Sequence, residues 1–134
     1  MARVLLETLN VFFFVFHTCL VVFNVVGWAW RRARPWNLAT LGLTAASWFI
    51  MGIWRGTGYC LCTDLHFRVR AALGIHDTAD NYLQLLARMI TGIDPSPALV
   101  RQVAALGFGL AVVASIALNV RDRIGNISTS PRTS

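Results

Sequence analysis

The sequence predicts an all-α integral membrane protein with three membrane-spanning helices and one or two short helices in a long connection at 55–97. Hydrophobic residues make up 56% of the 134 residues, and charged residues only 13%. Soluble domains carry about 25% charged residues, and a chain this short has too small an interior to hide so much apolar surface. Three long uncharged stretches are the second observation, since charge is costly inside a bilayer.

Each uncharged stretch has the length of a spanning helix, which needs about 20 mostly apolar residues. The stretches cover 8–30, 35–54 and 102–120. We therefore expect spans at about 7–30, 36–54 and 99–120.

These spans form one transmembrane domain, expected at 1–123. The remaining tail at 124–134 is rich in Ser, Thr, Gly and Pro. Segments of this composition bury little apolar surface, so we expect the tail to be disordered.

The first two spans are predicted to form an antiparallel hairpin. Arg31, Arg32 and Arg34 end the first span, and Pro35 can begin the second, because a missing N–H costs nothing at the start of a helix. Tryptophans stand at the span ends, where indole rings prefer the membrane interface: Trp28, Trp30, Trp36 and Trp54.

The connection at 55–97 is predicted to begin with a short helix. Thr63 or Asp64 can cap its start, because short polar side chains accept hydrogen bonds from the first free N–H groups. The helix is expected to continue through Ala72 and to stop at Gly74, since glycine commonly ends helices.

A second short helix is predicted from a cap at Asp77 or Asp80 to about Thr91. Its apolar residues recur at helical spacing and give one apolar face: Tyr82, Leu86, Met89 and Ile93. The segment is too short, and with Arg88 too polar, to span, so a helix lying on the membrane is favoured. A fourth span over 80–93 is the alternative.

The arginines predict orientation and argue against nucleic-acid binding. The net charge is +6 and all the basic residues are arginine, but they flank apolar runs instead of forming a basic face on a soluble fold. The first turn and the C-terminal tail concentrate arginine close to the spans, which places both in the cytoplasm. The N-terminus and the long connection then face outward, and the lipid bilayer is the first partner.

A polar stripe runs along the first span. Asn10, His17 and Asn24 recur every seven residues, close to two helical turns, with Glu7 just before them. The second span carries a matching stripe, so the two are expected to face each other: Asn37, Thr40, Thr44 and Ser47.

The stripe has a structural and a functional interpretation. Polar side chains hydrogen-bond across membrane helices at about 0.6 to 2 kcal/mol each, which would hold the hairpin together. Alternatively, His17 with Asn10 and Asn24 binds a haem, pigment, quinone or lipid, or relays protons. A bis-histidine haem is disfavoured, because the other histidines, His66 and His76, are expected outside the membrane.

The densest cluster of reactive residue types lies at the start of the long connection. Cys60 and Cys62 are one residue apart, and His66 follows on the expected short helix. Thiol-redox chemistry is one interpretation, and a metal site with His76 as a further ligand is another, although the spacing of these residues matches no established zinc pattern. Packing of small apolar side chains is the third, and it is the one we expect for Cys19 in mid-span.

The motif residues resemble a family of small bacterial inner-membrane proteins of unknown function. Its members carry a histidine in the first span and a Cys-Pro-Leu-Thr loop, often followed by an acidic residue three positions after the threonine. The resemblance covers about 9–120 and rests on these residues: Phe16-His17, Phe23, Gly27, Gly58-Tyr59-Cys60, Thr63 and Tyr82. It implies a multi-pass protein of the bacterial inner membrane and no mechanism.

Three residues depart from the family pattern. Leu61 stands where proline is expected, Cys62 where leucine is expected, and His66 where an acidic residue is common. The second cysteine, Cys62, is therefore not part of the family pattern that the other residues resemble.

Three functions remain open from the sequence. The preferred one is an accessory subunit packing against a larger respiratory or photosynthetic membrane complex, since the sequence shows no phosphate loop, nucleophile elbow or paired carboxylates and requires no cofactor or metal. The second is an outward-facing thiol-redox enzyme using Cys60 and Cys62. The third is a cofactor, pigment or lipid binder around His17, with His66 as a further candidate.

Overall fold

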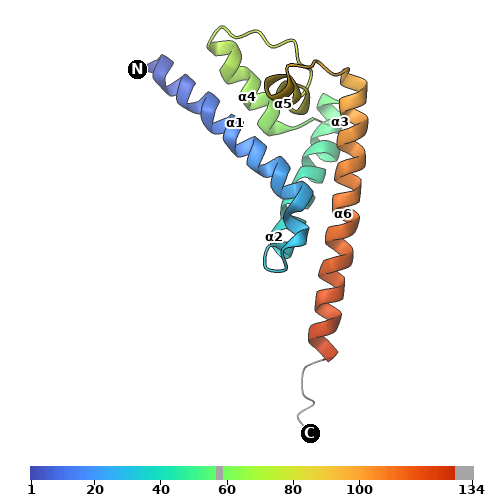
Figure 1. Cartoon of the computed structure of the whole chain (residues 1–134). Coiled ribbons are helices and arrows are strands. Elements are labelled where there is room, and N and C mark those ends of the chain that lie inside the picture. Colours follow the sequence, from blue (N-terminus) through green and yellow to red (C-terminus); the bar gives the residue numbers. More distant parts are fainter. Residues whose placement is uncertain (57–58, 129–134) are drawn as a thin grey trace.

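Helices make up all the regular structure in the described residues, 1–56 and 59–128 of a computed structural model (Figure 1). Three of them are long and apolar enough to cross a membrane, and they cover Ala2–Ala29, Arg34–Arg55 and Pro97–Ile127. The three predicted spans are thus confirmed as helices of spanning length. No fourth helix of that kind occurs in these described ranges.

The long helices are built from several regular segments. The first is α1 (Ala2–Val26) with a closing 3₁₀ turn at Gly27–Ala29. The second joins α2 (Arg34–Ala46), a π-helical turn at Ser47–Met51 and α3 (Gly52–Arg55). The third is α6 (Pro97–Ser128), which continues past Arg123, where the tail was expected to begin.

The hairpin of α1 and α2 depends on a close approach at Gly27. Asn37 of α2 is fully buried, and its Nδ2 donates to the backbone carbonyls of Phe23 at 2.7 Å and Asn24 at 3.3 Å. A Cβ on Gly27 would lie 2.9 Å from that Nδ2. Glycine at this position therefore lets the Asn37 amide approach the carbonyls at the end of α1, where the Phe23 carbonyl also accepts from the Gly27 N–H.

Helix α6 packs along α2 and is tied to it at the end that holds the α1–α2 turn, which we call the arginine end. Arg34 Nη1 lies 2.7 Å from Asp122 Oδ2, and Asn119 Nδ2 donates to the Arg34 carbonyl at 3.2 Å. Further along, the rings of Trp48 and Phe108 lie with centroids 4.8 Å apart. These contacts fix α6 against the hairpin at two levels.

The opposite end, the loop end, holds α4 (Leu61–Ala72) and α5 (Tyr82–Thr91). Both helices were predicted, but their caps differ. Cys60 precedes α4 in place of Thr63 or Asp64, which lie inside its first turn. Asn81 caps α5 in place of Asp77 or Asp80, and its side chain accepts from the Gln84 N–H.

The ends of the two short helices follow the prediction. Gly74, with φ of 79°, follows the end of α4 and prevents the helix from continuing. Gly92 takes the left-handed conformation directly after α5. Helix α5 has ten residues, too few to span. On α5, Tyr82 is buried and Met89 is exposed, and Ile93, also exposed, lies beyond the end of the helix. The predicted apolar face is therefore shared between the protein interior and its surroundings.

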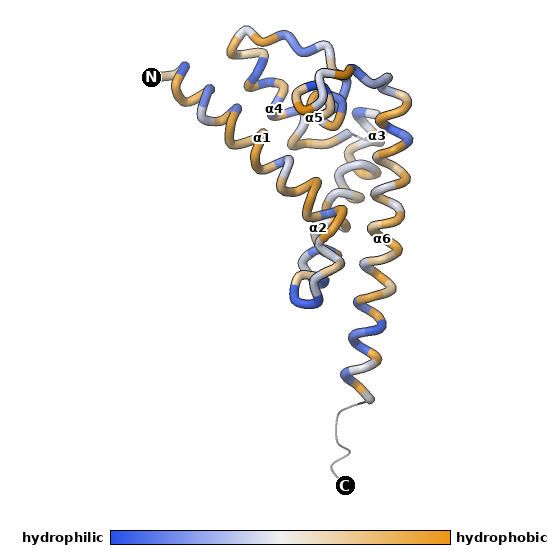
Figure 2. The backbone as a smooth tube through the Cα atoms, in the orientation of Figure 1, coloured by the Kyte–Doolittle hydropathy of each residue, from blue (hydrophilic) through white to orange (hydrophobic). Residues whose placement is uncertain are grey.

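Most large apolar side chains lie on the outside of the bundle. Little of each spanning segment is buried within the protein, 11% for the first and last and 17% for the second. Figure 2 shows hydrophobic colour along α1 and α6, with hydrophilic residues gathered at the arginine end and the loop end. This distribution fits helices surrounded by lipid.

A candidate thiol site between α1, α4 and α5

The polar stripe of α1 divides between two partners. Asn24 meets α2, where its Nδ2 donates to Thr44 Oγ1 at 2.9 Å and its Oδ1 accepts from Thr40 Oγ1 at 2.7 Å. Asn10 and His17 instead face the loop end. The two stripes therefore face each other at Asn24, as expected, but not at Asn10 and His17, because α4 packs against the first half of α1 (Figure 1).

The chain turns back after α3 to bring α4 to this position. Gly56 has φ of 99°, a conformation in which other residues are strained. Ser47 Oγ, in the π-helical turn, donates to the Tyr59 carbonyl at 3.2 Å and accepts from the Leu61 N–H at 3.5 Å. The start of α4 is thus held beside the middle of the second long helix instead of beyond its end.

This return places Cys60 against the middle of α1. Its Sγ lies 3.9 Å from His17 Nε2, although the two residues are 43 positions apart. Cys60 is half-buried and His17 is buried. A cysteine next to histidine at the start of a helix has the surroundings that favour a thiolate.

The two loop thiols are electrostatically unequal. The hydrogen bond from Cys62 lowers the pKa of Cys60, and the His17 side chain and the Thr63 backbone N–H lower it further, against the opposing effect of burial. The same hydrogen bond, together with burial, raises the pKa of Cys62. Cys60 is therefore the nucleophilic thiol and Cys62 the one that keeps its proton.

The ring of Tyr82, on α5, packs against the face of the His17 ring. The two rings stack with centroids 3.9 Å apart and an angle of 14° between their planes. The Tyr82 hydroxyl donates to the Phe14 carbonyl at 2.8 Å and lies 2.7 Å from Thr18 Oγ1. Because both ends of the tyrosine are held, the imidazole is held in one orientation toward Cys60.

His66 completes the cluster on α4. It is fully buried, and its Nε2 lies 2.9 Å from Asn10 Oδ1. A carboxamide oxygen only accepts, so Nε2 carries the proton. Burial, followed by the charge of Arg70, lowers the pKa of His66, which keeps the ring neutral.

The placement of His66 corrects one expectation. It was expected outside the membrane, at a different level from His17, yet both rings lie near Tyr82, with the His66 centroid 6.0 Å from it. His76 lies exposed beyond the end of α4. His66 is therefore closer to His17 than its place in the long connection suggested, because α4 runs beside α1.

The three cysteines are unbonded and form no metal site with other side chains in the described residues. Cys19, Cys60 and Cys62 are all free, and Cys19 is exposed on the outside of α1 instead of packed inside. Over 1–56 and 59–128, no group of three or more His, Cys, Asp or Glu side chains is arranged to hold a metal ion. The described residues thus present a dithiol beside a histidine.

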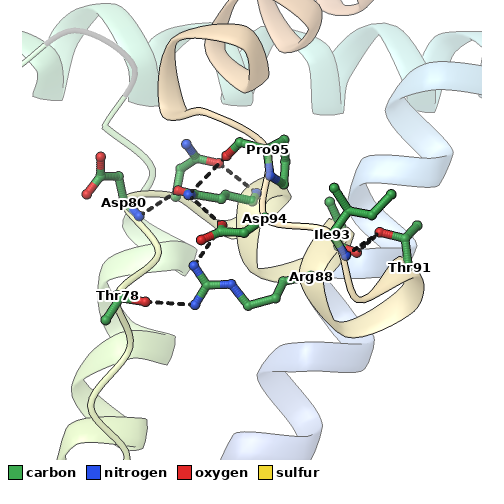
Figure 3. A network of polar contacts seen from close by, with 10 residues as sticks. Thr78, Asp80, Arg88, Thr91, Ile93, Asp94 and Pro95 are labelled. Carbon is green, nitrogen blue, oxygen red and sulfur yellow. Dashed lines mark hydrogen bonds and ion pairs between the residues drawn. The ribbon is translucent and has the colours of Figure 1, made fainter.

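Helix α5, which carries Tyr82, is braced by an ion-pair network (Figure 3). Arg88 donates to Thr78 Oγ1 and to Asp94 Oδ1, both at 2.8 Å. Gln84 Nε2 donates to the same carboxylate oxygen at 3.0 Å, and its Oε1 accepts from the Asp80 N–H at 3.0 Å. The network joins the segments before and after α5, so it fixes the helix that positions Tyr82.

A family model described as Protein of Unknown function (DUF2784) matches residues 7–120. The chain belongs to this family. No match was found among curated proteins or solved structures. The matched region of the DUF2784 chain contains the whole His17–Cys60–Tyr82 cluster, which comes from α1 and the two short helices.

The residues on which the family resemblance rests converge in the fold. His17, Cys60 and Tyr82 come from α1, the start of α4 and α5, and they are in contact. Gly58, another of those residues, lies outside the described residues. Sequence reasoning treated Tyr82 as part of an apolar face and missed its stacking on His17; its place in the resemblance was the signal that could have linked the two.

Proposed function

We propose that the protein is a membrane-embedded thiol oxidoreductase that cycles Cys60 and Cys62 between dithiol and disulfide. The observation that carries the proposal is the contact of Cys60 Sγ with His17 Nε2 at 3.9 Å, made at the start of a helix and next to a second thiol. Reactive cysteines occur in such partly exposed, electropositive surroundings. A buried structural thiol needs none of these neighbours.

The chemistry follows from the unequal thiols. Starting from the disulfide, a substrate thiolate attacks Cys62 Sγ, the bond to Cys60 breaks, and Cys60 leaves as the thiolate that His17 stabilises. A second substrate thiolate then attacks the substrate sulfur of this mixed disulfide, and Cys62 leaves and takes a proton. Two electrons have moved from the substrate dithiol to the pair, and the substrate carries the new disulfide.

The setting that supports this chemistry is the outer face of a bacterial inner membrane. The short segments at the arginine end hold arginines such as Arg31, Arg32 and Arg121 with Asp122 as their one acidic residue, whereas the arginines of the long connection are mixed with four aspartates. Basic residues in short segments near spans favour the cytoplasm. The loop end with Cys60 then faces the outside. Disulfides form and persist on that side of the membrane.

The test uses a Cys19→Ser background, in which Cys60 and Cys62 are the only thiols. The purified protein in mild detergent is equilibrated with mixtures of reduced and oxidised glutathione, and intact mass is measured after acid quenching. We expect the protein mass to fall by two hydrogen atoms at a defined glutathione redox potential, as Cys60 and Cys62 form the disulfide. Adding Cys62→Ser should instead trap one glutathione on Cys60, since no second thiol can displace it.

A matched variant tests the role of His17. His17→Asn in the same background keeps a polar side chain but removes the imidazole, and we expect slower formation of the disulfide. An unmodified mass for the parent across the whole range of potentials would exclude the proposed function.

The other two functions stay predictions. Co-purification at fixed stoichiometry with a larger complex tests the accessory subunit. An absorbance spectrum of the pure protein tests the cofactor or pigment binder around Asn10, His17, Asn24 and His66.

A further inference from the structure

The depth of Cys60 restricts what can reach it. Ser47, which is hydrogen-bonded to both Tyr59 and Leu61, lies roughly 12 Å before the end of the second long helix at Arg55, at 1.5 Å per residue. His17, which contacts Cys60, lies in the middle of the first. Cys60 is therefore level with the apolar part of the two long helices.

Charged groups show where the polar zone begins on α4. Asp64 and Arg68, one and two turns after Cys60, pair with each other at 2.9 Å. The side chains on the remaining exposed surface of the same turns, Leu61 and Leu65, are apolar. Cys60 thus lies one turn before the first charged pair on α4.

The surface of α1 beside the site is also apolar. Phe16, the neighbour of His17, is exposed and stacks on the exposed Phe12 with ring centroids 5.7 Å apart and an angle of 14° between the planes. Water-soluble oxidants would have to leave water to approach Cys60 through such surfaces, whereas an apolar planar molecule meets aromatic faces there.

We propose that the electron acceptor that reoxidises Cys60 and Cys62 is a quinone dissolved in the bilayer. This inference rests on the proposed function and names its oxidant. A dithiol gives up two electrons and two protons when it becomes a disulfide, and a quinone takes up two of each as it becomes a quinol. Quinones are oxidants of this class that reside in the membrane's apolar layer.

The step balances with groups that the site holds. The S–S bond forms between Cys60 and Cys62, and both electrons pass to the quinone ring. One proton comes from the Cys62 thiol. The other is the Cys60 proton, which the neighbouring His17 passes on, and the quinone leaves as the quinol.

The experiment uses the Cys19→Ser protein in phosphatidylglycerol–phosphatidylethanolamine vesicles, fully reduced and freed of reductant without oxygen. The probe is a short-tailed ubiquinone analogue, whose fully substituted ring resists direct addition of thiols. Oxidised glutathione at the same total concentration is the comparison. Thiol loss is followed by mass and quinol formation by ultraviolet absorbance.

We expect one quinol for each disulfide formed. Oxidation of the two thiols by the quinone should be at least about tenfold faster than oxidation by oxidised glutathione, because its apolar tail concentrates the quinone in the bilayer. The Cys62→Ser variant should form no quinol, since it cannot close the disulfide. His17→Asn should slow the quinone reaction without abolishing it.

The outcomes separate the inference from the proposed function. Disulfide formation with glutathione but not with the quinone overturns the quinone and leaves thiol exchange intact. Quinol formation by Cys62→Ser at the parent rate also overturns it, because the electrons would then come from elsewhere. No disulfide with either oxidant removes both proposals together.

Discussion

His17 and Tyr82 stack nearly parallel, with ring centroids 3.9 Å apart. The first residue belongs to a spanning helix and the second to a short helix of the long connection. Their contact couples the orientation of the imidazole beside Cys60 to the placement of α5. Changes to Tyr82 should therefore separate the packing of the site from its reactivity.

Replacing Tyr82 with Phe should weaken the fold and spare the thiol. The ring still stacks on His17, but the hydrogen bond to the Phe14 carbonyl is lost, which costs about 0.5 to 1.5 kcal/mol. Tyr82→Leu removes the stacking as well and should lower the alkylation rate of Cys60. Thermal unfolding in detergent and timed alkylation measure the two effects, and equal loss of Cys60 reactivity in both variants would contradict this assignment.

The two loop thiols should differ in how their alkylation depends on pH. Because the pKa of Cys60 is lowered, its thiolate persists below the ordinary thiol range near pH 8.5, and its rate with iodoacetamide should stay level down to about pH 6. The pKa of Cys62 is raised, so its alkylation rate should fall continuously as the pH is lowered over the same range. Peptide mass mapping of the Cys19→Ser protein separates the sites; a tenfold fall per pH unit at Cys60 would refute the prediction.

Acid should destabilise the protein partly through His66. Its pKa is lowered in the fold by burial, so the unfolded chain binds the proton more readily. The neutral ring contributes stability that is present above the unfolded value near 6.5 and is lost as pH falls toward the folded value. His66→Gln, which can still donate to Asn10, should therefore show a smaller drop in Tm between pH 7.5 and 5.5 than the parent, and an equal drop would argue against it.

Gly27 and Asn37 should show coupled effects on stability. Gly27→Ala places a methyl group 2.9 Å from Asn37 Nδ2 and from the Phe23 ring. Asn37→Ala removes the hydrogen bond that the Phe23 carbonyl accepts in addition to the one from the Gly27 N–H, at a cost of about 0.5 to 1.5 kcal/mol. The double variant relieves the part of the clash that involves Asn37, so its loss of stability should be smaller than the sum of the single losses. Denaturant or thermal unfolding of all four proteins measures the coupling, and additivity would contradict the close contact.

The sequence determined the spans, since each depends on a local property of the chain. Uncharged apolar runs of about 20 residues have no soluble alternative in so short a protein. Gly74 was placed correctly as a stop for a similar local reason. The caps were harder, because Thr63, Asp64, Asp77 and Asp80 are as suitable locally as Asn81, and long-range packing selects among them.

Only the tertiary structure decided the site. The sequence offered His17, Cys60, Cys62 and His66 as separate candidates on a span and a loop, with no signal for the direction of α4. The chain turns back along the bundle after the positive-φ residue Gly56, and the hydrogen bonds of Ser47 hold it there. This return brings Cys60 to His17 and His66 to Asn10, over separations of 43 and 56 residues in the sequence. Local pattern gives the helices, but the contacts between them depend on how the whole chain packs.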